Sequence, residues 1–297
     1  MLNNLHVVTL AVAAIIASTA PTSAQQAETQ QEPVWVTSSG VSWTLFPSGD
    51  IYPVYVADPH RPTNIIAESF TLGGGIPDSR SPLTRLGAGG RFGMLRIGPA
   101  QAGGRSWQFS IEAGLDAIFD SHYKLDVAGW DGNYGLTVTT ASDSPVGLKF
   151  ALLHTSAHLG DEYQDRTGRV RINYTREEFC FGVRWRWSPR WHAYGETGVA
   201  FRTGDSMLEP WRVQGGMEYE SRASLWGQRF ARYVAADVLV MQERDWRMDV
   251  TVDLGIVTRG GGRASRVFFQ WHDGRPTVNE FFRDSESSIS LGLRIDL

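Results

Sequence analysis

Near the middle of the chain, His154, Ser156 and His158 occupy every second position. In a β-strand, residues two apart point to the same face, so these three side chains would stand in one row. A serine beside a histidine is a pair used in nucleophilic catalysis, because the imidazole can take the hydroxyl proton. Before His154 the same face is apolar, with Val146, Leu148, Phe150 and Leu152. The pattern predicts a strand whose apolar face becomes polar at one end.

A second alternating face follows the polar loop 160–168. It begins with polar residues and then becomes apolar: Arg171, Asn173, Thr175, Glu177, Phe179, Phe181, Val183, Trp185 and Trp187. In an antiparallel hairpin, residues equally far from the loop face each other across the two strands. The sequence therefore predicts that Asn173 lies roughly opposite His154.

A hydrolase built on this hairpin would need a nucleophile, a base and a group that orients the base. We assign these catalytic roles to Ser156, His154 and Asn173 in that order. Three more polar residues on the same faces are candidate binding residues: His158, Arg171 and Glu177.

Two other interpretations of these residues stay open. Polar side chains are expected where strands leave a membrane, so the row can mark that boundary alone. His154, His158, Asp161 and Glu162 can also be read as metal ligands, although their HxxxH spacing suits a helix and this stretch alternates as a strand. A Ca²⁺ site at Asp161, Glu162 and Asp165 is the version that oxygen ligands favour.

The strands that would carry these residues are long. The best alternating runs, such as 107–119 and 246–258, take about 10–13 residues. A tilted strand that crosses a bilayer needs about 9–11 residues, and a soluble strand has about five or six. The second face of these runs is charged in mid-strand, with Glu112, Asp116, Arg184, Arg186, Arg212, Glu218, Asp249 and Asp253. In a transmembrane β-barrel such residues point into the lumen and pair there, while the apolar face meets lipid.

We predict about twelve antiparallel strands. Their approximate ranges are 62–72, 85–98, 106–119, 133–142, 145–159, 169–187, 191–203, 209–222, 232–243, 246–258, 264–273 and 287–297. An even number puts both termini on the periplasmic side, so the longer connections 74–84, 120–132, 160–168 and 274–286 would face outward. His154 and Ser156 would then lie on the lipid side near the outer rim.

Residues 1–24 have the pattern of a secretory signal peptide, in which the apolar run Val7–Ala17 is too short to span a bilayer. We expect a periplasmic extension over residues 25–60 and the barrel over residues 61–297. The net charge of -4 and the lack of basic runs give no case for nucleic-acid binding. Cys180 is the sole cysteine, so no intrachain disulfide can form.

The stretches LLHTSAHLGDEY, RINYTREEF and the upstream LFPSGDIYPVYVADPHRPT resemble a bacterial family known as domain of unknown function 1207. This resemblance implies a Gram-negative envelope protein and no particular activity. The His154–Ser156 pair is also similar to the rim of outer-membrane phospholipase A and the lipid A deacylases. Those barrels carry a His-x-Ser pair on the outward face, with an Asn or Glu from the next strand. Here Ala157 and His158 follow the serine in place of Asn-Gly.

We therefore expect an all-β transmembrane barrel of the Gram-negative outer membrane, preceded by a signal peptide. Its role would be structural or transport-related, and the alternative is a lipid hydrolase of the phospholipase or lipid A deacylase type, with Ca²⁺ as the ion to test. The expected partners are outer-membrane lipids and the barrel-assembly machinery.

Overall fold

The structure is a computed structural model that describes residues 34–296 apart from residue 102 and residues 261–262. Residues 1–24, the predicted signal peptide, lie outside the described part. Within the described part no helix is both long and apolar enough to cross a membrane.

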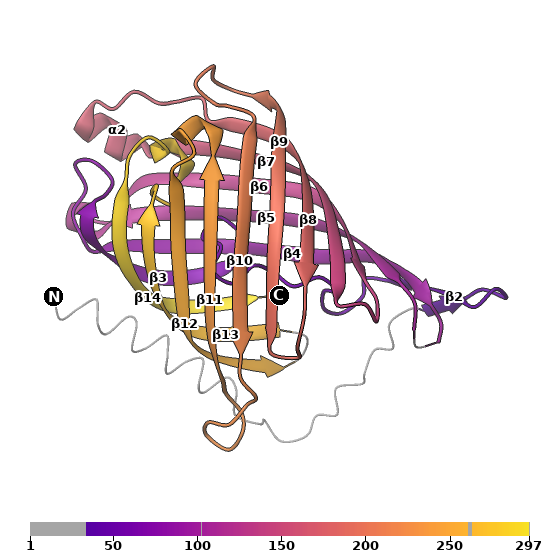
Figure 1. Cartoon of the computed structure of the whole chain (residues 1–297). Coiled ribbons are helices and arrows are strands. Elements are labelled where there is room, and N and C mark those ends of the chain that lie inside the picture. The colour runs from indigo at the N-terminus through magenta and orange to yellow at the C-terminus, as the bar shows by residue number, and fades with distance from the viewer. Residues whose placement is uncertain (1–33, 102, 261–262, 297) are drawn as a thin grey trace.

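Twelve antiparallel strands form a closed barrel (Figure 1). Each strand pairs with the next along the chain, and the pairing of β14 with β3 closes the circle. The strands are β3 (Asn64–Gly74), β4 (Leu83–Pro99), β5 (Ser106–Asp120), β6 (Asp126–Ala141), β7 (Val146–Leu159), β8 (Thr175–Trp185), β9 (Trp191–Thr203), β10 (Trp211–Glu220), β11 (Ala231–Met241), β12 (Met248–Gly260), β13 (Arg263–Gly274) and β14 (Glu286–Asp296). The predicted all-β barrel of about twelve strands is confirmed.

The two faces of each strand separate by polarity. In β7, Phe150 and Leu152 point outward and are 46% and 40% exposed, whereas the alternate residues Lys149 and Ala151 are buried in the lumen. An outward apolar face is stable only against lipid, because in water it would expose a wide hydrophobic band. This alternation determines which residues of β7 meet lipid.

Paired charges fill much of the lumen. Glu178 contacts Arg176 and Arg212 at 2.9 and 2.7 Å, and Glu196 contacts Lys149 and Arg212 at 2.9 and 2.6 Å. A charge taken out of water is costly unless it is paired and hydrogen-bonded, so these contacts hold one another in place. The predicted pairing of lumenal charges is observed at these positions.

The chain enters the barrel before the first wall strand. The hairpin of β1 (Val34–Val36) and β2 (Val41–Leu45) extends the edge of β4 and projects from the wall (Figure 1). Residues 46–63 then run through the lumen; Tyr55 donates to Glu196 at 3.1 Å, and Val56 N donates to Glu218 at 2.6 Å. Sequence periodicity, which predicts an extension over residues 25–60, did not reveal this inward course.

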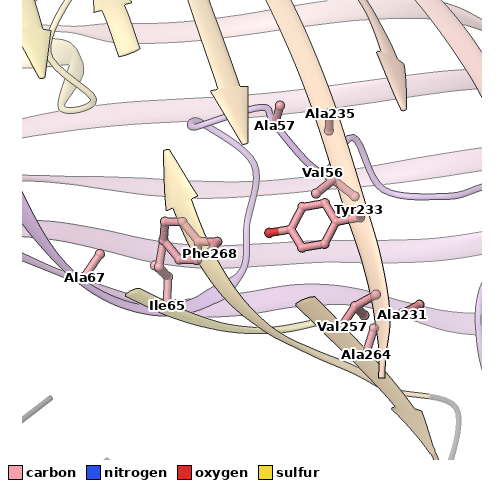
Figure 2. Close-up of a cluster of buried hydrophobic side chains, with 10 residues drawn as sticks. All are labelled: Val56, Ala57, Ile65, Ala67, Ala231, Tyr233, Ala235, Val257, Ala264 and Phe268. Atoms are coloured by element: carbon pink, nitrogen blue, oxygen red, sulfur yellow. The ribbon is translucent and has the colours of Figure 1, made fainter. Parts of the chain in front are cut away.

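Apolar contacts also hold this inward segment, residues 46–63. Figure 2 shows Val56 and Ala57 in one buried cluster with Tyr233 of β11 and Phe268 of β13. Tyr55 stacks on Tyr194 of β9 with ring centroids 3.7 Å apart. The segment therefore packs against the wall as part of the interior.

Loops cover the outer end. The helix α2 (Asp161–Thr167) follows β7, and the single-turn helices η1 (Ser121–Tyr123), η2 (Gln242–Arg244) and η3 (Asn279–Phe281) lie in other outer loops. Asp131 on β6 accepts hydrogen bonds from the backbone and side chain of Asn279, which fixes η3 over the lumen. Strand β6 begins at Asp126, so the connection predicted over residues 120–132 is shorter than expected.

Candidate functional site

Three neighbouring strands, β6, β7 and β8, carry the candidate site on the outward face of the barrel. The register pairs His154 with Tyr134 of β6 on one side and with Glu177 of β8 on the other. Ser156 lies between Gly132 and Thr175. The polar row therefore stands near the outer end of an otherwise apolar face, as the alternation predicted.

His154 is held by both neighbours. Its ring stacks on Tyr134, with centroids 4.3 Å apart and an interplanar angle of 18°. Its Nδ1 lies 3.7 Å from Glu177 Oε1, too far for a hydrogen bond, although a small shift of either side chain would form one. A carboxylate facing Nδ1 stabilises the imidazolium and leaves Nε2 for proton transfer.

Ser156 has space around its hydroxyl. Gly132 lies opposite, and a Cβ there would sit 3.4 Å from Ser156 Oγ, so glycine keeps this side of the serine open. Within the described residues the Ser156 hydroxyl makes no hydrogen bond, including none to His154. Catalytic hydrogen bonds are often long or absent without substrate. The serine and histidine are therefore neighbours on one face that are not hydrogen-bonded to each other.

Asn173 does not lie opposite His154, and that predicted pairing is wrong. Ala157 N donates to Tyr174 O, which puts Asn173 at the level of His158. Its amide donates to Gly204 O at 3.0 Å. The loop is asymmetric because α2 and an extended stretch precede β8, so the partner of His154 comes later in the chain.

The predicted binding residues surround this pair in different ways. His158 stacks on Trp130 of β6 with centroids 4.1 Å apart, and Arg171 forms an ion pair with Asp161 of α2. Glu177 also approaches Arg202 of β9 at 3.7 Å. The outward face thus carries an aromatic pair, a cation and a carboxylate beside the serine.

The predicted Ca²⁺ ligands do not converge. Asp161, Glu162 and Asp165 lie on α2, where Asp161 is exposed beside Arg171. In the part of the chain that the structure describes, no group of three or more His, Cys, Asp or Glu side chains has the arrangement of a metal site. The three carboxylates are therefore not arranged to bind one metal ion together.

The sequence pattern identified Glu177 as a candidate binding residue but did not predict that it pairs with His154 across β7 and β8. It also missed Tyr134, Trp130 and Arg202, which lie on strands flanking the hairpin. Their signal exists only once the register is known, because β6 meets β7 through pairs such as Tyr134 with His154.

Comparisons with known proteins agree with this fold. A family model described as "Protein of unknown function (DUF1207)" matches residues 3–296, as the quoted stretches predicted. No curated protein matches the sequence. Among solved structures, outer membrane phospholipase A from Escherichia coli is similar with a TM-score of 0.56 and 9% identity, covering 84% of this chain and 98% of that one.

The Salmonella typhi outer membrane phospholipase, a dimer with bound calcium, is similar with a TM-score of 0.54 and 10% identity. The match covers 79% of this chain and 90% of that chain. Likeness at such low identity shows a shared fold alone. The chain is thus an outer-membrane-type barrel.

Proposed function

Since this chain belongs to the DUF1207 family of outer-membrane-type barrels, we propose that it is an acyl hydrolase acting on membrane lipids. Ser156 is the nucleophile, His154 the base, and Glu177 the residue that orients the base. The observation that carries the proposal is the position of this serine, histidine and carboxylate on one lipid-facing row at the outer end of β7 and β8.

The proposed reaction follows from the order of the groups. His154 Nε2 takes the proton of Ser156 Oγ as the oxygen attacks a lipid ester carbonyl, and Glu177 stabilises the imidazolium from the Nδ1 side. The protonated imidazole then gives its proton to the departing alcohol, and water hydrolyses the acyl-serine with His154 again as base. The substrate reaches the serine from the outer leaflet without leaving the membrane.

Transport through the lumen is disfavoured by the packing of the barrel interior. The inward segment and the paired charges occupy much of it, and the cavity at mid-barrel beside Tyr55, Lys149 and Arg212 has a volume of about 130 Å³. A space of that size holds a few water molecules and no solute path. We further expect an outer-membrane location, reached by export and by the barrel-assembly machinery, with membrane lipids as the direct partners.

The proposal is tested by refolding the protein into detergent and measuring fatty-acid release from phospholipid and from lipopolysaccharide, with and without Ca²⁺. We expect Ser156→Ala to abolish release, because the nucleophile is gone. Ser144→Ala, in the turn at the opposite end of β7, is the matched control and should retain the wild-type rate. Equal release by wild type and Ser156→Ala, or no release by wild type from either lipid, contradicts the proposal.

A further inference from the structure

A cavity of about 420 Å³ opens at the periplasmic end of the barrel, opposite to the candidate site. The inward segment forms one wall through Asp50 and Val54, and β8 to β14 with the residues that follow β8 form the rest. Its lining contains both acidic and basic side chains, so the balance of their partners determines what the cavity can bind.

The acidic residues of this cavity are already paired. Their contacts are Asp50 with Arg91 at 2.8 Å, Glu218 with His192 at 3.2 Å, Glu220 with Arg259 at 2.6 Å, and Asp296 with Arg61 at 2.7 Å and with Arg266. No carboxylate among the described lining residues is left for another cation.

Arg184 is different. Its side chain lines the cavity with only 7% of the residue exposed, and within the described residues it has neither an acidic partner nor a hydrogen bond. The centroid of the Tyr52 ring lies 5.9 Å from the guanidinium carbon. Arg186, two positions along and exposed, lines the same cavity and forms no ion pair among the described residues. The sequence predicted that both would be paired.

The Nε of Arg184 is buried without a partner, so the guanidinium has lost part of its hydration and gained no counter-ion, which is unfavourable. Guanidinium groups present parallel N–H donors that match the oxygens of a phosphate. Inorganic phosphate and phosphate monoesters carry more charge than a carboxylate, so they suit two guanidiniums on one strand face. A phosphate diester carries a single charge but still offers two free oxygens to the N–H donors. The cavity is also large enough for a phosphate ester headgroup.

We propose that this cavity binds a phosphate group at Arg184, with Arg186 as the second contact, and that the phosphate comes either from the periplasm or from an inner-leaflet lipid. The binding does not depend on the hydrolase proposed above, because Ser156 lies at the other end of β7. The site is a binding site for a phosphate monoester, a phosphate diester or inorganic phosphate.

Binding is measured by calorimetry with inorganic phosphate on the full chain in a phosphate-free amine-oxide detergent, at constant ionic strength. We expect one phosphate per chain with a dissociation constant of about 1 mM or tighter, since charge-assisted hydrogen bonds supply affinity in this range. Arg184→Gln should weaken binding by about tenfold or more. Arg259→Gln, in the same cavity but paired with Glu220, is the matched control and should weaken it far less.

A second arm distinguishes the source of the phosphate. Protein reconstituted with phosphatidylglycerol is re-extracted, and phosphorus is counted per chain for wild type and Arg184→Gln. Retention of one lipid by wild type alone identifies a lipid headgroup, whereas calorimetric binding without retention identifies a soluble phosphate. Folding is checked separately, because Arg184→Gln removes a buried unpaired charge and should unfold no earlier than wild type in phosphate-free buffer. Absence of both signals in wild type, or equal signals in Arg184→Gln, overturns the proposal.

Discussion

At the scale of single residues, the environment of His154 argues for a role beyond marking the membrane boundary. A histidine at a waterline needs no particular neighbours, yet His154 is packed between the Tyr134 ring and the Glu177 carboxylate, and its side chain is 17% exposed. Its Nδ1 is buried without a hydrogen-bond partner among the described residues. The Glu177 carboxylate, 3.7 Å from this nitrogen, therefore occupies the place of the orienting group in the proposed acyl transfer.

We predict that Glu177→Gln lowers the rate of acyl release by about 100-fold or more, because the amide cannot stabilise the imidazolium. Asn173→Ala should leave the rate unchanged, since its side chain is bonded to Gly204 O and does not face His154. The measurement is the initial rate of fatty-acid release by the two variants under saturating lipid. A large loss in Asn173→Ala with little loss in Glu177→Gln would restore the triad predicted from sequence.

At the scale of elements, the outer loops form a cap whose polar groups are buried. In η3, Glu280 is fully buried and accepts the backbone N–H of Ile172, which ties the stretch before β8 to the cap. Burial raises the pKa of the Glu280 carboxyl above its ordinary value, and the Ile172 hydrogen bond opposes that shift in part. The same contact fixes the position of Ile172 in the stretch that leads into β8.

We predict that Glu280 makes the protein less stable as the pH rises. A carboxyl whose pKa is higher in the folded protein contributes stability fully below its ordinary pKa, and this contribution is lost as the pH rises through the folded-state value. Glu280→Gln keeps an oxygen acceptor for Ile172 and should reduce this dependence. Urea unfolding midpoints at pH 4 and pH 8 measure it, with the exposed Glu162→Gln as control. An unchanged pH dependence in Glu280→Gln contradicts the prediction.

The elements also show what the sequence could and could not predict. Alternation located all twelve wall strands because one face meets lipid and the other the lumen, so polarity repeats every second residue. It also assigned His154 and Ser156 to the lipid side. Alternation did not identify the partner of His154, because the strand register depends on how many residues the loop with α2 takes up before β8 begins. That number leaves no periodic signal in the sequence. The inward segment escaped prediction for a related reason, since Tyr55 and Val56 are bound by residues far along the chain.

At the scale of the whole molecule, the barrel has a largely filled interior and a candidate site at each end. The candidate hydrolase site lies at one end and the proposed phosphate cavity at the other, and the inward segment with the lumenal ion pairs lies between them. By the proposals above, the first end faces the outer leaflet and the second faces the periplasm. Tyr55 is central to this filling, because it stacks on Tyr194 and donates to Glu196, which also holds Lys149 and Arg212. A closed interior keeps water from the mid-membrane charges and keeps the wall strands in fixed register.

The native Cys180 reports on that closure. Its thiol is buried in the lumen and donates to Glu178 at 3.2 Å, beside Arg212. We predict that a charged maleimide labels it slowly in the folded protein, and that Tyr55→Ala raises the labelling rate by about tenfold or more. Removing a packed aromatic ring costs several kcal/mol, and about 1.4 kcal/mol of that in local opening corresponds to a factor of ten.

Tyr134→Ala, which removes an aromatic ring from the outward face of β6, is the control and should leave Cys180 protected. Planar-bilayer recordings on the same samples should show no channel steps for wild type, because the inward segment blocks the path. Fast labelling of wild-type Cys180, or channel steps without any substitution, would mean that the inward segment leaves the lumen in the membrane. The barrel would then function as a conduit, because solutes of maleimide size would reach its centre.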